Sequence, residues 1–500
     1  MTNSFYLKLL YLLAGAISVF AFAPLNYWYC IIISYIVWIK ILNGQNSKHL
    51  LINCYIFGFG YFFTNLYWTF ICLHQVINLN ILISLIIYTT FTLFLAIYLV
   101  VAGILYLSLR VTTPKLQLIN YILFMPSCWL IAEMLRSKLL SGFPWYNLGY
   151  TAINNPLLKG FFPIGGEYLT TWLLLSIIGA IYSLFKQIHK NYLIIIGCYI
   201  IAILSLGYSL HNIQYTVNTN KTISVALIQG NNSVAEKWNN SYFHLLLNKY
   251  AQMIATAKSA DLIILPETAI AVFPQLLPSH YLQDLQKLAP KSQIIIGMPM
   301  PITKSKPQGY TNSALLINNF SYYNKQHLVP YGEYIPLKKL LGDFYQQVSL
   351  PMVNFQTGHN HSSNLNINNI NIAFNLCYEN GFSQELLTNN QKAQVIVNLS
   401  DMIWYKNTWA KDHHLQMSIA RSLENQKYWL QDTNSGDTAI ISPQGKVVAS
   451  LLSNHQDILF YKVPIINGST PYQKYGNLII YSVLLVVIGI RLIILTKLFT

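Results

Sequence analysis

The sequence predicts a two-part protein: a multi-span α-helical membrane domain of about eight transmembrane helices, and an α/β domain inserted before the last helix. Two features of composition carry this prediction. Hydrophobic residues make up 54% of the 500 residues and charged residues only 9%, whereas a typical soluble domain is about one-quarter charged. From about residue 220, long apolar runs give way to short ones between polar stretches, so a membrane-embedded part is followed by a water-facing part.

Eight apolar runs predict the membrane helices. Most reach the roughly 20 residues that a helix needs to cross the hydrocarbon core of a bilayer, although the second and fifth are short. The runs cover residues 6–23, 28–43, 51–72, 80–107, 118–135, 168–185, 191–210 and 476–496. The segment "AFAP" at 21–24 is similar to a signal-peptide cleavage site. Because Pro24 follows it and more runs come after, we expect the first run to be retained.

The positions of the basic residues predict the orientation in the membrane. The net charge is +15, which on a soluble protein would suggest a nucleic-acid partner. Here the basic residues fall between apolar runs, as the positive-inside rule describes, so we expect no nucleic acid. One set of run ends carries Lys8, Lys40, Lys48, Arg110, Lys115, Lys186, Lys190, Arg491 and Lys497.

The opposite connections "APLNYWY" and "LHQVINLN" contain no Lys or Arg, although Arg136, Lys138 and Lys159 break the pattern. We therefore expect both termini in the cytoplasm. The predicted domains are a seven-helix membrane domain at 1–214, an exported catalytic domain at 215–470 and a final helix at 471–500.

Short apolar runs rich in Ile and Val predict buried strands in the exported domain. They are "SVALIQG" (224–230), "DLIILPE" (261–267), "QIIIGMPM" (293–300), "YTNSALLI" (310–317), "INIAFNLCYE" (370–379) and "AQVIVNLS" (393–400). Apolar residues at helical spacing predict helices at 240–259 and 409–425. Strands that alternate with helices predict an α/β layered fold.

Three polar residues, Glu267, Lys325 and Cys377, each follow an apolar run, and such strand ends line the working edge of α/β folds. A cysteine attacks carbonyls when a base removes its proton, a carboxylate can be that base, and a lysine can stabilise the oxyanion. Together they form a complete set for acyl transfer through a thioester. Separately, Glu267 could cap a turn, Lys325 could be solvated, and Cys377 could be an inert core residue.

Cys377 also has no cysteine partner in its own domain, since the other five cysteines fall within the predicted spans. An unpaired thiol in an exported domain suggests a reactive residue. The order Glu–Lys–Cys, with "LPE", "YNKQHLVPYGEY" and "CYE", resembles the nitrilase superfamily. The whole chain resembles the bacterial apolipoprotein N-acyltransferase family, on the segments "AFAPLNYW", "SGFPWYNLGY", "QGNNSVAEKW", "LPETAIAVFP", "CYEN", "TNSGDTAIISPQGKV" and "TPYQKYGN".

The resemblance implies a nitrilase-like α-β-β-α sandwich for the exported domain and a role for each matched residue. The implied catalytic residues are Glu267 as general base, Lys325 for oxyanion stabilisation and Cys377 as nucleophile. The implied supporting residues are Glu333, which assists the lysine, Tyr378 and Glu379, which follow the nucleophile, and Trp238 at the rim of the site.

The resemblance also implies a reaction in two half-steps at the bacterial inner membrane. Cys377 takes an acyl chain from a phospholipid, and the α-amino group of a diacylglyceryl-modified cysteine on a lipoprotein then receives it. We expect a monomer, no cofactor and no metal. Residues 411–416 and 358–361 contain histidines, but the first reads as an exposed helix start, the second as a loop, and neither has a clear third ligand.

Three features of the sequence bear on how substrates reach the site. Family members commonly carry Asn-Asp where this chain has Asp401 and Met402, so the local hydrogen bonding must differ.

Residues 328–357 form a long apolar connection, which suits either a lid that meets lipid or a loop packed over its own core. The apolar residues of this connection are Ile335, Leu337, Leu340, Leu341, Phe344, Leu350 and Met352, beside Lys338 and Lys339. Trp145, Tyr146 and Tyr150 suggest further interface contacts.

Two alternative functions are considered. A transporter would carry ionisable residues inside its spans, but Lys8, Lys40, Glu133 and Arg491 lie near run ends. A membrane-tethered amidase of the nitrilase type would use the same three residues on a small amide, and it would need a closed polar pocket. The membrane frame and the apolar connection favour a lipid acyl donor.

Overall fold

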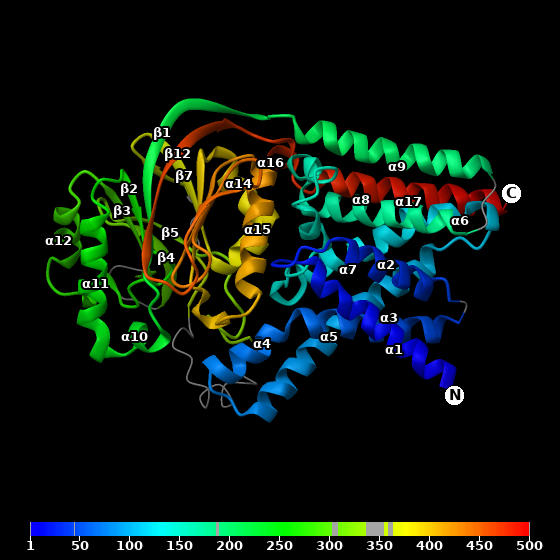
Figure 1. The fold of residues 1–500 in the computed structure, drawn as a ribbon, viewed down its shortest axis with the longest axis horizontal. Coiled ribbons are helices and arrows are strands. Elements are labelled where there is room, and N and C mark those ends of the chain that lie inside the picture. The colour runs from blue at the N-terminus through cyan, green and yellow to red at the C-terminus, as the bar shows by residue number, and fades with distance from the viewer. Residues whose placement is uncertain are drawn as a thin grey trace. The chain divides into compact units, whose positions relative to one another are not determined.

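The computed structural model describes residues 2–44, 46–186, 190–302, 309–336, 355–358 and 364–499. The chain divides into two compact units (Figure 1). One unit comprises Met1–Ile213 with Lys474–Thr500 and is helical. The other comprises Gln214–Gln473 and contains the sheets. The apolar connection 328–357, for which a lid and a packed loop were both considered, falls largely within 337–354, outside the described residues.

The helical unit contains a helix in each of the eight predicted runs. Its main helices are α1 (Thr2–Ala16), α2 (Tyr29–Leu42), α3 (Ser47–Asn65), α4 (Tyr67–Ile71), α5 (Ile81–Leu109), α6 (Gln117–Ile119), α7 (Met125–Arg136), α8 (Phe162–Leu184), α9 (Lys190–His211) and α17 (Leu478–Phe499). Among the described residues, six helices are long and apolar enough to span a membrane, or seven if the bent segment Ser47–Val76 is one span. The predicted count of eight is not confirmed, because α2 has only 14 residues.

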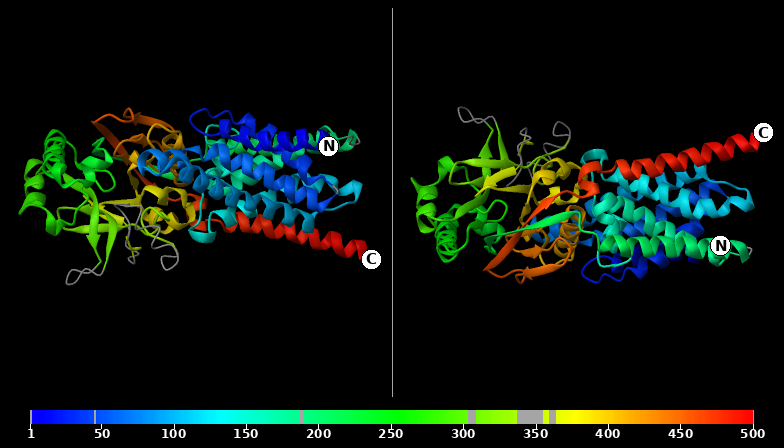
Figure 2. Two further views of the ribbon diagram at one scale, coloured as in Figure 1. Left: turned by 90° about the horizontal axis from the view of Figure 1, so that it is seen from below. Right: turned by 90° about the horizontal axis from the view of Figure 1, so that it is seen from above.

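Close helix packing in this unit depends on small residues, as in membrane helix pairs generally. A Cβ atom on Gly60 of α3 would lie 2.1 Å from the carbonyl oxygen of Leu12 in α1, and one on Gly15 would lie 2.1 Å from that of Phe57. No larger residue fits either position without moving the backbone. Figure 2 shows the long helices of this unit running side by side.

The segment between α7 and α8 folds inward, so the prediction that its aromatic residues meet the membrane interface is wrong. Trp145, Tyr146 and Tyr150 are each only 2% exposed. The guanidinium of Arg136 donates to the carbonyl oxygens of Phe143 and Trp145. These backbone carbonyls are therefore satisfied by protein rather than water, which allows the loop to be buried.

The second unit is an α-β-β-α sandwich, as the resemblance implied. In the described residues, one six-stranded sheet has the order β12-β1-β2-β3-β4-β5 and the other the order β11-β10-β9-β8-β7-β6. The first comprises β1 (Thr216–Gln229), β2 (Leu262–Ile264), β3 (Gln293–Pro301), β4 (Tyr310–Leu316), β5 (Ser321–Asn324) and β12 (Asp457–Gly468). The second comprises β6 (Asn364–Ile367), β7 (Ile370–Leu376), β8 (Val395–Ser400), β9 (Trp429–Thr433), β10 (Ala439–Ile441) and β11 (Val447–Ser450).

Helices cover the outer faces of both sheets, and side chains from facing strands fill the space between them. The helices of this unit are α10 (Val234–Trp238), α11 (Phe243–Thr256), α12 (Tyr281–Leu288), α14 (Ser383–Lys392), α15 (Ala410–Asn425) and α16 (Pro471–Tyr475). α11 and α12 cover the first sheet, and α14 and α15 the second. The inner faces contribute Leu227, Ile264, Phe374, Leu399 and others to one buried cluster. Alternate residues of each strand thus face the central core.

Asp432 of β9 interrupts this central core. It pairs in register with Leu399, which pairs with Leu376, so it occupies an otherwise apolar row. Among the described residues, neither carboxylate oxygen has a hydrogen-bond partner, and burial raises the pKa of Asp432 well above its ordinary value. Ionising this carboxyl in the folded protein is therefore costly.

Asp432→Asn is expected to have a larger free energy of unfolding than wild type, by an amount that increases as the pH rises. The unfolded aspartate ionises near pH 4, whereas the folded one keeps its proton, so wild-type stability falls between those two pKa values by about 1.4 kcal/mol per pH unit. The asparagine variant lacks this loss. Thermal unfolding of the full chain in detergent should show a gap that is small at pH 4 and widens toward pH 8. Asp284→Asn, at an exposed position, is the control, and a gap independent of pH would contradict the assignment.

Candidate active site

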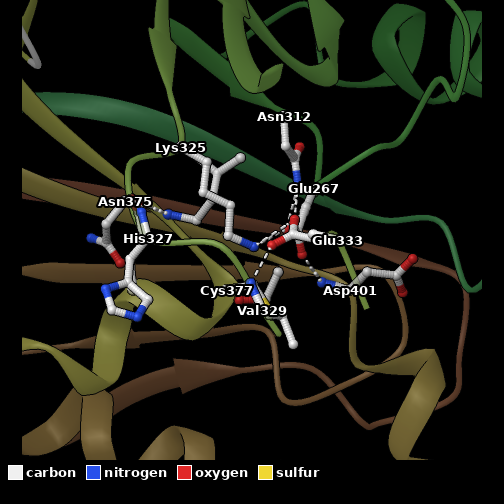
Figure 3. A network of polar contacts seen from close by, with 12 residues as sticks. Glu267, Asn312, Lys325, His327, Val329, Glu333, Asn375, Cys377 and Asp401 are labelled. Carbon is white, nitrogen blue, oxygen red and sulfur yellow. Dashed lines mark hydrogen bonds and ion pairs between the residues drawn. The ribbon is translucent and has the colours of Figure 1, made fainter. Parts of the chain in front are cut away.

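The ends of three strands bring Glu267, Lys325 and Cys377 together, as the sequence predicted (Figure 3). Lys325 and Cys377 directly follow β5 and β7, while Glu267 lies three residues beyond β2. All three side chains are buried. Two sheets of the sandwich therefore supply one compact group of polar residues.

Lys325 lies between two carboxylates. Its Nζ atom is 3.0 Å from Oε1 of Glu267 and 2.9 Å from Oε1 of Glu333. Asn312 of β4 bridges the same pair, because its Nδ2 donates to Oε1 of Glu267 at 2.7 Å and to Oε1 of Glu333 at 3.0 Å. The amide N–H of Val329 binds the other oxygen of Glu333 at 2.8 Å. These donors fix both carboxylates around the ammonium group.

Asn312 was not predicted from the sequence. It lies in the middle of a run that reads as a strand, where a single polar residue has many possible explanations. A buried asparagine on a strand must find partners for its amide, and in the part of the chain that the structure describes these are the distant Glu267 and Glu333. The contact to Glu267 spans 45 residues of sequence.

A second buried ion pair holds the other side of Glu267. Oε2 of Glu267 accepts from the amide N–H of Asp401 at 3.0 Å. The carboxylate of Asp401 lies 2.5 Å from Nζ of Lys237, which also donates to the carbonyl oxygen of Glu267 at 3.2 Å. The departure from Asn-Asp thus places a carboxylate at 401, where it is neutralised by Lys237, and a buried Met402 beside it.

Cys377 begins a tight turn, Cys377–Gly381, with a backbone φ of +48°, which is uncommon for a residue with a side chain. The carboxylate of Glu379 accepts from the amide N–H groups of Leu376, Gln326 and His327 at 2.6, 2.6 and 3.1 Å. The hydroxyl of Tyr323 lies 2.9 Å from both oxygens of Glu379. Glu379 therefore joins the cysteine turn to the segment that follows Lys325.

The charges around the thiol determine its protonation. Burial raises the pKa of Cys377, Glu267 raises it further, and Lys325 only partly opposes them, so it lies well above its ordinary value. Burial also raises the pKa of Glu267 against the effect of Lys325. For Lys325, burial lowers the pKa, but the two carboxylates outweigh it and keep the ammonium charged. The raised pKa favours a thiol at Cys377 rather than a preformed thiolate.

The remaining predicted residues surround this group. Trp238 ends α10 and packs with Tyr310, Tyr334 and Trp404 around the buried side chains of Leu328 and Phe355. Tyr378 is buried and contacts the rings of His327 and Phe382. The structure therefore places Trp238 among aromatic residues and Tyr378 next to the nucleophile.

The prediction that residues 411–416 form an exposed helix start is wrong. Lys411, His413 and His414 are buried. The Nζ atom of Lys411 donates to the carbonyl oxygen of Ser435, and a ring nitrogen of His414 contacts the carbonyl oxygen of Cys377. In the described part of the chain no group of three or more His, Cys, Asp and Glu residues could hold a metal ion. Residues 359–361 of the second histidine motif lie outside that part.

Comparisons with known proteins match both units of the chain. Residues 14–180 match the family model described as apolipoprotein N-acyltransferase N-terminal domain, and residues 224–465 match carbon-nitrogen hydrolase. A protein from Chromobacterium violaceum named apolipoprotein N-acyltransferase is 33% identical over 93% of this chain and 89% of its own length. Proteins of the same name from Neisseria meningitidis serogroup B and Coxiella burnetii are 32% and 31% identical. They match over 94% and 96% of this chain and 93% and 98% of their own lengths.

Proposed function

The chain belongs to the apolipoprotein N-acyltransferase family, and from this premise we propose that it takes its acyl group from a membrane phospholipid and carries it as a thioester on Cys377. The protein is a membrane acyltransferase with a nitrilase-fold catalytic unit, and N-acylation of lipoproteins is the activity of its family. The observation that carries the proposal is the buried group formed by Cys377, Glu267 and Lys325, in which Nζ of Lys325 lies 3.0 Å from Oε1 of Glu267 (Figure 3).

In the first half-reaction, Glu267 removes the proton from the thiol as the sulfur attacks an ester carbonyl of the phospholipid. The ammonium of Lys325 stabilises the oxyanion that forms. When the intermediate collapses, the C–O bond breaks and the proton passes from Glu267 to the departing alkoxide. The products are a lysophospholipid and the acyl-enzyme.

In the second half-reaction, the α-amino group of an S-diacylglyceryl cysteine attacks the thioester carbonyl. Glu267 accepts a proton from the amine and returns it to the sulfur as the C–S bond breaks. Glu333 and Asn312 keep Lys325 and Glu267 in place through both halves. No step requires a redox change, and the only nucleophiles are the thiol of Cys377 and the amine of the acceptor.

We propose that residues 215–470 form the catalytic domain on the periplasmic side of the inner membrane, with both termini in the cytoplasm. The support is the distribution of Lys and Arg along the chain. The chain is proposed to act as a monomer, because one copy supplies Glu267, Lys325, Glu333 and Cys377.

Intact-mass measurement of the full chain in detergent micelles with a phospholipid of known acyl chains tests the proposal. We expect wild type to gain the mass of one acyl chain, and hydroxylamine to remove it. Cys377→Ala should gain none. Adding a synthetic diacylglyceryl-cysteine peptide should transfer the chain to the peptide N-terminus. If wild type stays unmodified while phospholipid binding is demonstrated, the phospholipid donor is wrong, and small amides become the substrates to test.

A further inference from the structure

His414 of α15 is a buried residue that contacts the backbone of Cys377. Its Nε2 atom lies 3.2 Å from the carbonyl oxygen of Cys377. A carbonyl oxygen only accepts hydrogen bonds, so this contact is a hydrogen bond in the tautomer that carries the proton on Nε2. The side chain is 1% exposed, and the histidine is 37 residues away along the chain.

His414 is itself held by a buried polar network. Its Nδ1 atom lies 3.1 Å from Oε1 of Gln431, whose Nε2 donates to the carbonyl oxygen of Asp437 at 2.7 Å. Ser418, one helical turn after His414, donates to Gln431 and accepts from Nδ2 of Asn380 in the cysteine turn. The ring is therefore enclosed by polar groups of β9 and α15 beside Cys377.

The backbone of Cys377 needs such support. A side-chain-bearing residue at a φ of +48° is strained and persists only where surrounding contacts hold it. On the strand side of the cysteine, Glu379 binds the amide N–H of Leu376. On the turn side, His414 binds the carbonyl oxygen of Cys377 itself. Because the peptide unit is planar, fixing this carbonyl also fixes the amide N–H of Tyr378.

We propose that His414 is a positioning residue: its Nε2–H holds the carbonyl of Cys377 and keeps the thiol directed at Glu267. The inference rests on the proposed role of Cys377 as the nucleophile. Burial lowers the pKa of His414 to about 4, so the ring is neutral near pH 7. His414 acts through the backbone of Cys377 and takes no part in the proton transfers.

A pair of variants of equal length separates the hydrogen bond from packing. In His414→Gln, the side-chain amide can occupy the place of Nε2 and donate to Cys377, whereas the thioether of His414→Met cannot. Two readouts are measured in the full chain: the rate of acyl-enzyme formation from phospholipid, and the rate of Cys377 alkylation by iodoacetamide without substrate. Thermal unfolding of each variant is recorded alongside.

We expect His414→Met to slow acyl-enzyme formation by about 100-fold, the loss that a misplaced reacting atom produces, and to change the alkylation rate. His414→Gln should stay within about fivefold of wild type in both. Equal losses in both variants, or none in either, would overturn the proposal. If wild type forms no acyl-enzyme, the proposed function fails, and the alkylation rates alone decide whether His414 positions the thiol.

Discussion

Glu267→Gln should slow formation of the acyl-enzyme by about 10³-fold, within the range that a general base contributes. The glutamine keeps the shape of the side chain but cannot accept the thiol proton. Since Cys377 is held as a neutral thiol with a raised pKa, no thiolate is available to replace the lost base. Single-turnover measurements by quenched intact mass give this rate directly.

The pH dependence distinguishes a base from a structural residue. Glu267 must be ionised to act, and burial raises its pKa above the ordinary value for a glutamate. The wild-type rate should therefore fall tenfold per pH unit below that raised pKa, and Glu267→Gln should lack this dependence. Glu333→Gln, which leaves the base in place, should lower the rate less and retain the acid limb. An acid limb that survives in Glu267→Gln would assign the proton transfer to another group.

Lys325→Met should have the second large effect, because it removes the one cation between two buried carboxylates. Breaking a buried ion pair from one side costs roughly 3–5 kcal/mol, since the remaining charge is left without a partner. Loss of the oxyanion donor should also slow acylation by about 10²–10³-fold. Both the thermal midpoint and the single-turnover rate of the full chain should fall.

A double variant separates these two effects. Lys325→Met with Glu333→Gln removes one of the stranded charges, so it should recover part of the lost stability and none of the lost activity. Lys287→Met, which breaks an exposed pair with Asp284, should change neither quantity appreciably. A stable and active Lys325→Met would rule out the ammonium as the oxyanion donor.

The three residues proposed to be catalytic could be selected from the sequence because each follows an apolar run, and the structure brings them together (Figure 3). The strands that carry Glu267 and Cys377, and helices α11 and α15, lie where apolar periodicity indicates them. The short edge strands β6 and β11 were not predicted. Each has only four residues, which is too short for an apolar run that would indicate a strand.

The residues that were missed depend on contacts between distant parts of the chain. Asn312 and His414 are recognised only when β4 and α15 are placed against Glu267 and Cys377. The burial of Trp145 likewise depends on Arg136 satisfying backbone carbonyls of the same loop. Local sequence describes the polarity of such residues but not the partner that makes burial favourable.

The pairing of β1 with β12 has a consequence for biosynthesis. These strands begin and end the catalytic unit, and their register runs from Thr216 with Gly468 to Gln229 with Asp457. The first sheet therefore cannot acquire its outermost ladder until nearly the whole unit has been translated. Because β12 ends at Gly468 and α17 begins at Leu478, the strand that completes this sheet and the final helix are made almost together.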